Sequence, residues 1–161
     1  MFRILKAVLV LFIGLHALIY GLQNLANLTE AHAALGYVVS GADHKAYPNT
    51  MFFHSASSAI HWFALILVLA GEFAVAFFGI KGGWNLFAAR KAPAKVFHAA
   101  KAAGLWAAGL ALLTWFGLFM TFGGAFYQMW QTEIGAASLA DAFHFATISA
   151  VTMLFVYLTE D

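Results

Sequence analysis

The stretch that decides the fold is ASSAIHWFALILVLAGEFAVAFFGI, residues 56–80, in which Glu72 is the only acidic or basic side chain apart from a histidine. The hydrocarbon core of a bilayer is about 30 Å thick and is crossed by about 20 apolar residues in a helix. The whole chain has the same character, since 63% of its 161 residues are hydrophobic and 9% are charged. A soluble domain carries about 25% charged residues. The composition therefore predicts a membrane protein.

Three further segments are long and apolar enough to span a bilayer: residues 4–22, 99–126 and 134–157. Lipid offers a peptide backbone no hydrogen bonds, so the spans are expected to be helical. The first apolar run is longer than the core of a signal peptide, about 7 to 15 residues, and is predicted to be retained. We therefore expect an all-α, four-helix membrane bundle that forms a single domain. The expected domain is 1–161, its outer loop 23–55 and its cytoplasmic loop 81–98.

The basic residues predict the orientation of this bundle. Only Lys45 falls in the loop 23–55, and the other Lys and Arg residues lie on the opposite side of the membrane. Loops rich in Lys and Arg stay in the cytoplasm, so both termini are expected there. The basic residues on the predicted cytoplasmic side are Arg3, Lys6, Lys81, Arg90, Lys91, Lys95 and Lys101.

The outer loop is expected to contain a short helix lying against the membrane. The sequence LANLTEAHAALGYVVSG, residues 25–41, offers Thr29 as a cap and Gly36 or Gly41 as an end, and Pro48 then prevents a continuation. The polar segment GADHKAYPNTMFFH, residues 41–54, is predicted to form the outer lid of the bundle.

Histidines concentrate in the outer half of the chain. Counted at 1.5 Å per residue from the predicted ends of the spans, His16, His61 and His144 all fall in one outer layer. Imidazoles bind copper, zinc and iron, and two of them can hold a haem iron. Asp141 precedes His144 by three residues and is positioned to orient its ring. The alternative is that these histidines only hydrogen-bond the outer loop and neighbouring helices. The loop itself adds His32, Asp43, His44 and His54.

Glu72 is the acidic residue expected deepest in the bilayer, where an ionised carboxylate costs about 2.5 kcal/mol or more. One interpretation is a proton relay or a quinone contact. The other is an ion pair with Lys101 or Lys6, whose long side chains reach inward. A separate polar cluster is expected at the outer rim, where amides either satisfy helix ends or line a shallow pocket under the lid. This cluster comprises Asn24, Asn27, Gln128 and Gln131.

The sequence lacks the residues that several classes of function require. The chain has no cysteine, no catalytic nucleophile–base set, no phosphate-binding loop and no basic tract for nucleic acid. Small residues recur at helical spacing on the third span, a pattern that lets another helix approach closely. We therefore expect other membrane subunits, besides lipid, to pack on this span. The small residues are Ala103, Gly104, Ala107, Ala108 and Ala111.

Seven short motifs, in order along nearly the whole chain, resemble one known family. They are GLQNLANL, GYVVSGADH, YPNT, GEFAVA, WNLFAAR, LLTWFG and GGAFYQMWQT, and they resemble the DUF2165 family of predicted small integral membrane proteins. The resemblance implies a bacterial four-helix protein of the inner membrane, and it implies no activity. The family's recurring outer motifs match at Asn24, Asn27, His32, Asp43, His44, Tyr47, Gln128, Trp130 and Gln131.

Three hypotheses about function follow. The first is a non-catalytic accessory subunit of a larger respiratory or redox complex. The second is a haem-, copper-, zinc- or iron-binding protein that uses His16, His61 and His144. The third is a small carrier or proton relay that uses Glu72.

Overall fold

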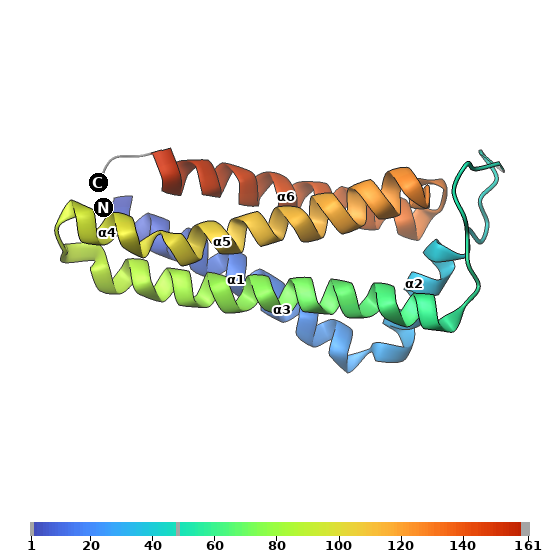
Figure 1. Cartoon of the computed structure of the whole chain (residues 1–161), viewed down its shortest axis with the longest axis horizontal. Helices are drawn as coiled ribbons and strands as arrows, with labels where there is room; N and C mark the ends of the chain where they lie inside the picture. The colour runs from blue at the N-terminus through green and yellow to red at the C-terminus, as the bar shows by residue number, and fades with distance from the viewer. Residues whose placement is uncertain (1, 48, 159–161) are drawn as a thin grey trace.

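The computed structural model describes residues 2–47 and 49–158, so the predicted role of Pro48 lies outside the described residues. Four helical stretches in this part of the chain are long and apolar enough to cross a membrane, and no strand occurs in it. They are α1 (Phe2–Ala26), α3 (Ser58–Ala88), the run from α4 (Ala94–Ala100) to η2 (Leu112–Phe126), and α6 (Glu133–Leu158). The all-α membrane bundle expected from the sequence is confirmed (Figure 1).

Two glycines bring α1 and α3 into close contact. A Cβ placed on Gly14 would lie 2.6 Å from the backbone nitrogen of Ile80, and one on Gly79 would meet the backbone of Gly14. Small residues let membrane helices approach until their backbones touch, and dispersion and weak hydrogen bonds then stabilise the pair. The contact between Gly14 and Gly79 therefore fixes the axial register of α1 against α3.

Helix α3 is longer than the second span expected from the sequence, because it continues to Ala88 through Gly82 and Gly83. Both glycines are buried: Gly82 lies against Gly104 on α5 (Ala102–Ala111), and Gly83 against Leu11 on α1. Part of the expected cytoplasmic loop is thus helix. The rest is η1 (Ala89–Lys91), a short connection and α4.

The small-residue face of the third span is used inside the molecule. Ala107, Ala108 and Ala111 are almost fully buried, and Gly104 contacts Gly82 and Val10. The close approach predicted from this face therefore occurs with the protein's own α3 and α1. The buried residues of this face are covered by the protein's own helices.

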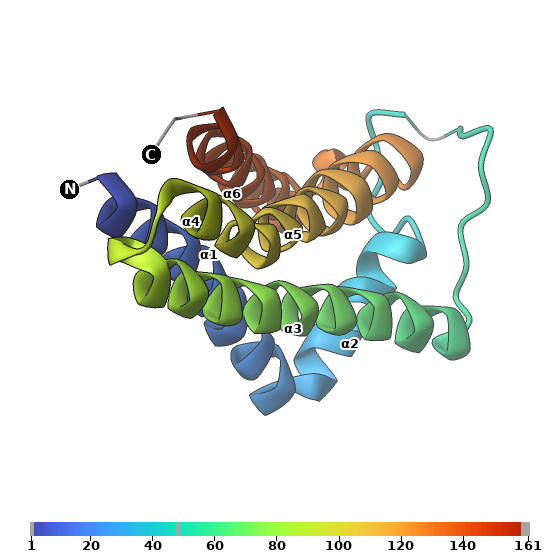
Figure 2. The same cartoon turned by 60° about the vertical axis from the view of Figure 1, so that its left-hand side comes forward.

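Helix α1 ends beside the middle of α3 and does not reach the level at which α3 begins. Gly21 lies against Phe73, and the Asn24 side chain contacts Glu72. The chain then bends at Asn27, and α2 (Leu28–Val39) crosses the first half of α3 (Figure 2). Thr29 lies within α2 and does not cap it, and Gly41, with φ +68°, follows its last turn. Space therefore remains between α1, α2 and α6.

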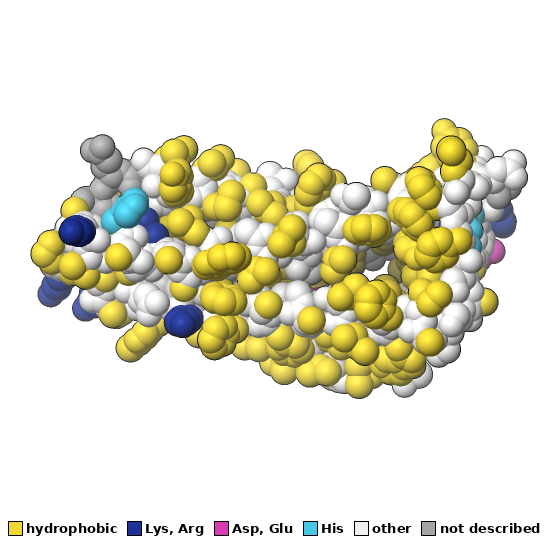
Figure 3. Space-filling view, in the orientation of Figure 1, with side chains coloured by type: hydrophobic (Ala, Val, Ile, Leu, Met, Phe, Trp, Pro, Cys, Tyr) yellow, Lys and Arg dark blue, Asp and Glu magenta, His cyan; other side chains and the backbone are white. Residues whose placement is uncertain are grey.

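The two ends of the bundle differ in charge. We call the end at which α1 begins and α6 ends the basic end, and the opposite end, formed by residues 40–47 and 49–57, the loop end (Figure 1). Lys and Arg side chains gather at the basic end, while hydrophobic side chains cover the length between the ends (Figure 3). The outer lid predicted within residues 41–54 is held at the loop end by Phe52, which stacks on Phe126 with ring centroids 4.3 Å apart.

Candidate functional site

A cavity of about 490 Å³ runs between α1 and α6, with α3 on its inner side and α2 toward the loop end. Most of its lining is apolar, but besides Tyr20 four acidic or histidine side chains from three membrane helices reach it. We call this cavity the polar chamber. These four residues are His16 on α1, Glu72 on α3, and Asp141 and His144 on α6.

Glu72 is 2% exposed, and its carboxylate is held by an amide. The Nδ2 group of Asn24 donates to both carboxylate oxygens, at 2.9 Å to Oε1 and 3.0 Å to Oε2. The expected partner Lys101 lies instead at the basic end, 5.9 Å from the centre of the Phe97 ring. The reason is axial distance: Gly82, about 15 Å along α3 from Glu72, is already level with Gly104. The observed partner of Glu72 is thus neutral.

His16 forms the aromatic contact between α1 and α6. Its ring stacks on Phe145 at 3.9 Å between centroids and on Tyr20 at 4.7 Å, and meets Trp115 edge-on at 6.4 Å. The Asp141 side chain lines the same cavity as this ring. His16 and Asp141 therefore belong to one polar group in the chamber, with the imidazole held flat between aromatic rings.

Asp141 and His144 are exposed on α6 and both line the polar chamber. Within the described residues no hydrogen bond joins them, so the predicted orientation of His144 by Asp141 is not seen.

A second cavity, of about 520 Å³, adjoins the polar chamber toward the loop end. Its lining comes mainly from α2, α3, η2 and α6. Tyr127, which follows η2, is the one ionisable residue in this lining, and we call the cavity the apolar chamber. Five residues line both cavities, and their side chains lie at the boundary between the two. The shared residues are Ala34, Leu35, Val68, Phe119 and Ser138.

The three histidines expected in one layer are not brought together. His16 lies between Gly14, which faces Gly79, and Gly21, which faces Phe73. His61 is therefore about 18 to 27 Å further along α3, toward the loop end. There its Nε2 is 2.8 Å from the carbonyl oxygen of Ser55. Across residues 2–47 and 49–158, no three His, Asp or Glu side chains are grouped so that they can hold a metal ion.

The histidines at the loop end form two pairs. His32 and His61 have ring centroids 5.6 Å apart, and those of His44 and His54 are 5.4 Å apart. Burial and the neighbouring His54 lower the pKa of His44. Beside this pair, the Tyr37 hydroxyl donates to Asp43 at 2.9 Å, which raises the pKa of the tyrosine. The loop histidines therefore lie near one another but far from His16.

The chain matches the family described as predicted small integral membrane protein (DUF2165) over residues 2–159. The protein belongs to this family. No curated protein and no solved structure matches the chain. The resemblance seen in the sequence motifs is confirmed, and the family description adds membrane location without an activity.

The amides of the outer rim have separate roles in this family member. Gln131 holds the lid by accepting from the Tyr47 backbone N–H at 2.8 Å, and it donates to Gln128 at 2.7 Å. Asn27 bonds the Gln23 carbonyl at the end of α1. The sequence reasoning grouped Asn24 with these rim residues and missed its contact with Glu72. The signal in the sequence for this contact was an amide side chain just after a short first span.

Proposed function

We propose that this protein binds a small amphipathic molecule with a positively charged head, taken up from the bilayer into the two adjoining chambers. The observation that carries the proposal is the convergence of ionisable groups from α1, α3 and α6 on the polar chamber. Ionisable side chains inside a membrane are costly, and they face functional cavities or each other. Here they share a cavity.

The charge of the chamber favours a cation. The lining holds two carboxylic acids, Glu72 and Asp141, and two histidines, with no Lys or Arg among the described residues. An ionised carboxylate in a low-dielectric cavity is strongly stabilised by a positive charge nearby. Asn24 orients the Glu72 carboxylate without neutralising it. A cationic head would supply the opposite charge that this chamber lacks.

The apolar chamber suits the tail of the same molecule. It adjoins the polar chamber and is lined by aliphatic and aromatic side chains from four helical elements. Ligand sites typically combine such an apolar lining with a few polar groups that fix orientation. Part of this lining comes from η2, a π-helical segment in which Tyr127 N–H bonds the carbonyl five residues back, at 2.8 Å. π-Helical turns are rare and frequent at functional sites.

A route from the lipid is available at the side of the bundle. Phe12 on α1 and Ile148 on α6 both line the polar chamber, and they are 60% and 58% exposed. The chamber therefore opens between α1 and α6, on the apolar side of the bundle. This position favours a ligand that partitions into the membrane before it binds.

The other hypotheses receive less support from the geometry. A haem or metal centre at His16, His61 and His144 would need side chains that lie in different parts of the bundle. An accessory-subunit role rested on the small-residue face of the third span, which is buried against α3 and α1. We retain the proposal of a non-catalytic protein in a bacterial inner membrane, with the basic end cytoplasmic. The supporting argument is the positive-inside rule.

Binding of two probes with the same tail tests the proposal. The purified protein in lipid nanodiscs should bind dodecyltrimethylammonium in saturable fashion, at about one per chain, after subtraction of binding to empty nanodiscs. Dodecyl sulfate has the same alkyl chain and the opposite charge, so it should show no saturable binding. Equal binding of both probes, or none of the cation, would refute the proposed ligand class.

A further inference from the structure

Three ring nitrogens of the His44–His54 pair at the loop end are buried without a hydrogen bond to the described residues. They are both ring nitrogens of His44 and Nε2 of His54, and none has a hydrogen-bond partner among residues 2–47 and 49–158. The two rings meet edge-to-face at 5.4 Å between centroids. Buried polar atoms are nearly always bonded, so an unpaired group points to a missing water or ion. Three such atoms on two facing imidazoles point to a shared ligand.

The backbone around the pair holds the two rings together. Gly41, at φ +68°, lies directly against the His54 ring, where a side chain would displace the imidazole. Asp43 also has positive φ, at 59°, and is tied to α2 by the Tyr37 hydroxyl. The Ser55 N–H bonds the Val39 carbonyl at 2.9 Å, which joins the two sides of the loop. A non-glycine residue with positive φ is uncommon and carries strain.

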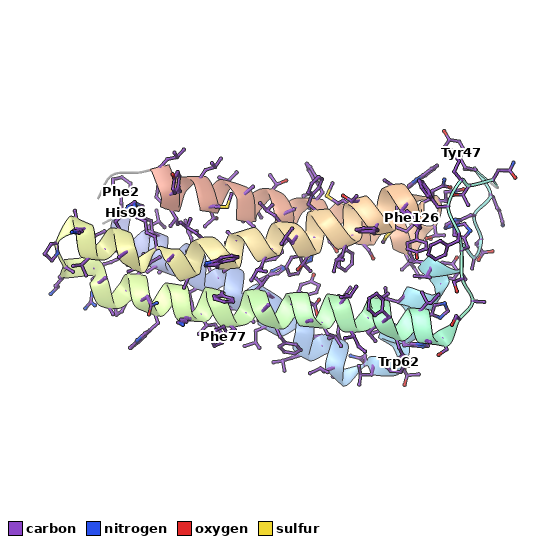
Figure 4. All side chains as sticks on the ribbon, viewed as in Figure 1. Phe2, Tyr47, Trp62, Phe77, His98 and Phe126 are labelled. Atoms are coloured by element: carbon purple, nitrogen blue, oxygen red, sulfur yellow. The ribbon has the colours of Figure 1, made fainter. Side chains whose placement is uncertain are left out.

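The second histidine pair provides a comparison within the same loop end. His32 and His61 are at nearly the same spacing, 5.6 Å between centroids. Their Nε2 atoms have partners, however: His61 bonds Ser55, and His32 contacts the hydroxyl and carbonyl of Ser58 at 3.3 and 3.4 Å. The His32 ring lies 4.5 Å from Trp62 and the His54 ring 6.4 Å from Tyr127, between centroids, at the end of the bundle where Figure 4 labels Tyr47, Trp62 and Phe126. Spacing alone therefore does not explain the unpaired nitrogens of His44 and His54.

We propose that His44 and His54 bind a late first-row transition-metal ion, copper or zinc. Imidazole nitrogens bind such ions at about 2.0 to 2.1 Å, which puts each ring centroid about 3 Å from the metal. Two centroids around one ion are then at most about 6 Å apart, and the observed 5.4 Å fits a bent arrangement. Water completes the coordination. This site is separate from the chambers and does not depend on the proposed cationic ligand.

Metal titration of the full chain, purified with a tag that contains no histidine, tests this site. Copper(II) or zinc(II) is titrated in competition with a chelator. Wild type should bind one equivalent. His44→Gln and His54→Gln should each lower the affinity by about tenfold or more, since even the loss of a supporting residue costs 10- to 100-fold. The matched variants His32→Gln and His61→Gln should bind as wild type does.

Retained affinity in both His44→Gln and His54→Gln, or an equal loss in the His32 and His61 variants, would overturn the proposal. Electron paramagnetic resonance of the copper(II)-loaded wild type gives a second readout that needs no variant. Coupling to imidazole nitrogens from two histidines is expected. A spectrum without imidazole coupling would also overturn it.

Discussion

At the scale of single residues, Glu72 shows how a neutral hydrogen-bond donor lowers the cost of burying a carboxylate. Its carboxylate is buried near the middle of α3, and the amide of Asn24 contacts both oxygens. A carboxylate that accepts two hydrogen bonds is less costly to bury than one without a partner. The sequence predicted that Glu72 needed a partner. It named a lysine because hydropathy does not reveal the axial register between helices.

Asn24→Leu should therefore destabilise the protein by about 1 to 3 kcal/mol, because it leaves Glu72 buried without its donor. Glu72→Leu in the same molecule should restore most of this loss, since removing both polar partners is nearly neutral. Denaturation of the two single variants and the double variant, as a double-mutant cycle, measures the coupling. Additive effects would show that the two side chains do not interact.

Gln131 makes a second prediction at residue scale, because its amide bonds both the N–H and the carbonyl of Tyr47. Gln131→Ala should raise hydrogen–deuterium exchange in residues 40–57 while the exchange of α3 stays unchanged. The control is Gln23→Ala, a rim amide for which the structure describes no side-chain hydrogen bond. Unchanged exchange in Gln131→Ala would show that other contacts hold the lid.

At the scale of elements, the long apolar runs were enough to predict all four membrane helices. Their ends were harder to predict. Gly82 and Gly83 look like a helix end in the sequence, yet they let α3 pack against α5 and α1, and packing overrides propensity. His61 does not share the level of His16, for a related reason. Depth counted from the ends of spans assumes a shared starting plane, whereas the Gly14–Gly79 contact shifts α1 along α3.

The glycine contact between α1 and α3 gives a prediction with a matched control. Gly14→Ala should destabilise the protein by about 1 to 3 kcal/mol, because the new Cβ meets backbone atoms that cannot move aside. Gly109→Ala, where a Cβ meets nothing within 4 Å, should be neutral or stabilising by up to about 1 kcal/mol. Unfolding of both variants in the same detergent gives the comparison. Equal stability would argue against tight packing at Gly14.

At the scale of the whole molecule, the difference in charge between the two ends predicts the orientation of the protein in the membrane. The chain has no cysteine, so a single introduced cysteine can be labelled without background. Lys45→Cys at the loop end should react with a membrane-impermeant maleimide in intact cells. Lys91→Cys at the basic end should react only after the cells are permeabilised, as the positive-inside rule requires. The reverse pattern would invert the proposed orientation.

The chambers are also a property of the whole molecule, since residues from α1, α2, α3, η2 and α6 line them. The sequence indicated several of the polar residues, because any ionisable residue in a span attracts notice. It grouped His16, Asp141 and His144 in one candidate site, but it did not indicate that Glu72 shares a cavity with them. That convergence depends on the early end of α1 and the bend at Asn27, which follow from packing between distant segments.

The most direct test of the account is the effect of Glu72→Gln on binding of dodecyltrimethylammonium in nanodiscs. Glutamine has the same shape, and its oxygen still accepts from Asn24, so the fold should survive while the negative charge is lost. Saturable binding should fall by about tenfold or more, a change worth about 1.4 kcal/mol per decade. Glu133→Gln, an exposed change at the start of α6, should bind as wild type does. Full binding by a folded Glu72→Gln protein would contradict the account.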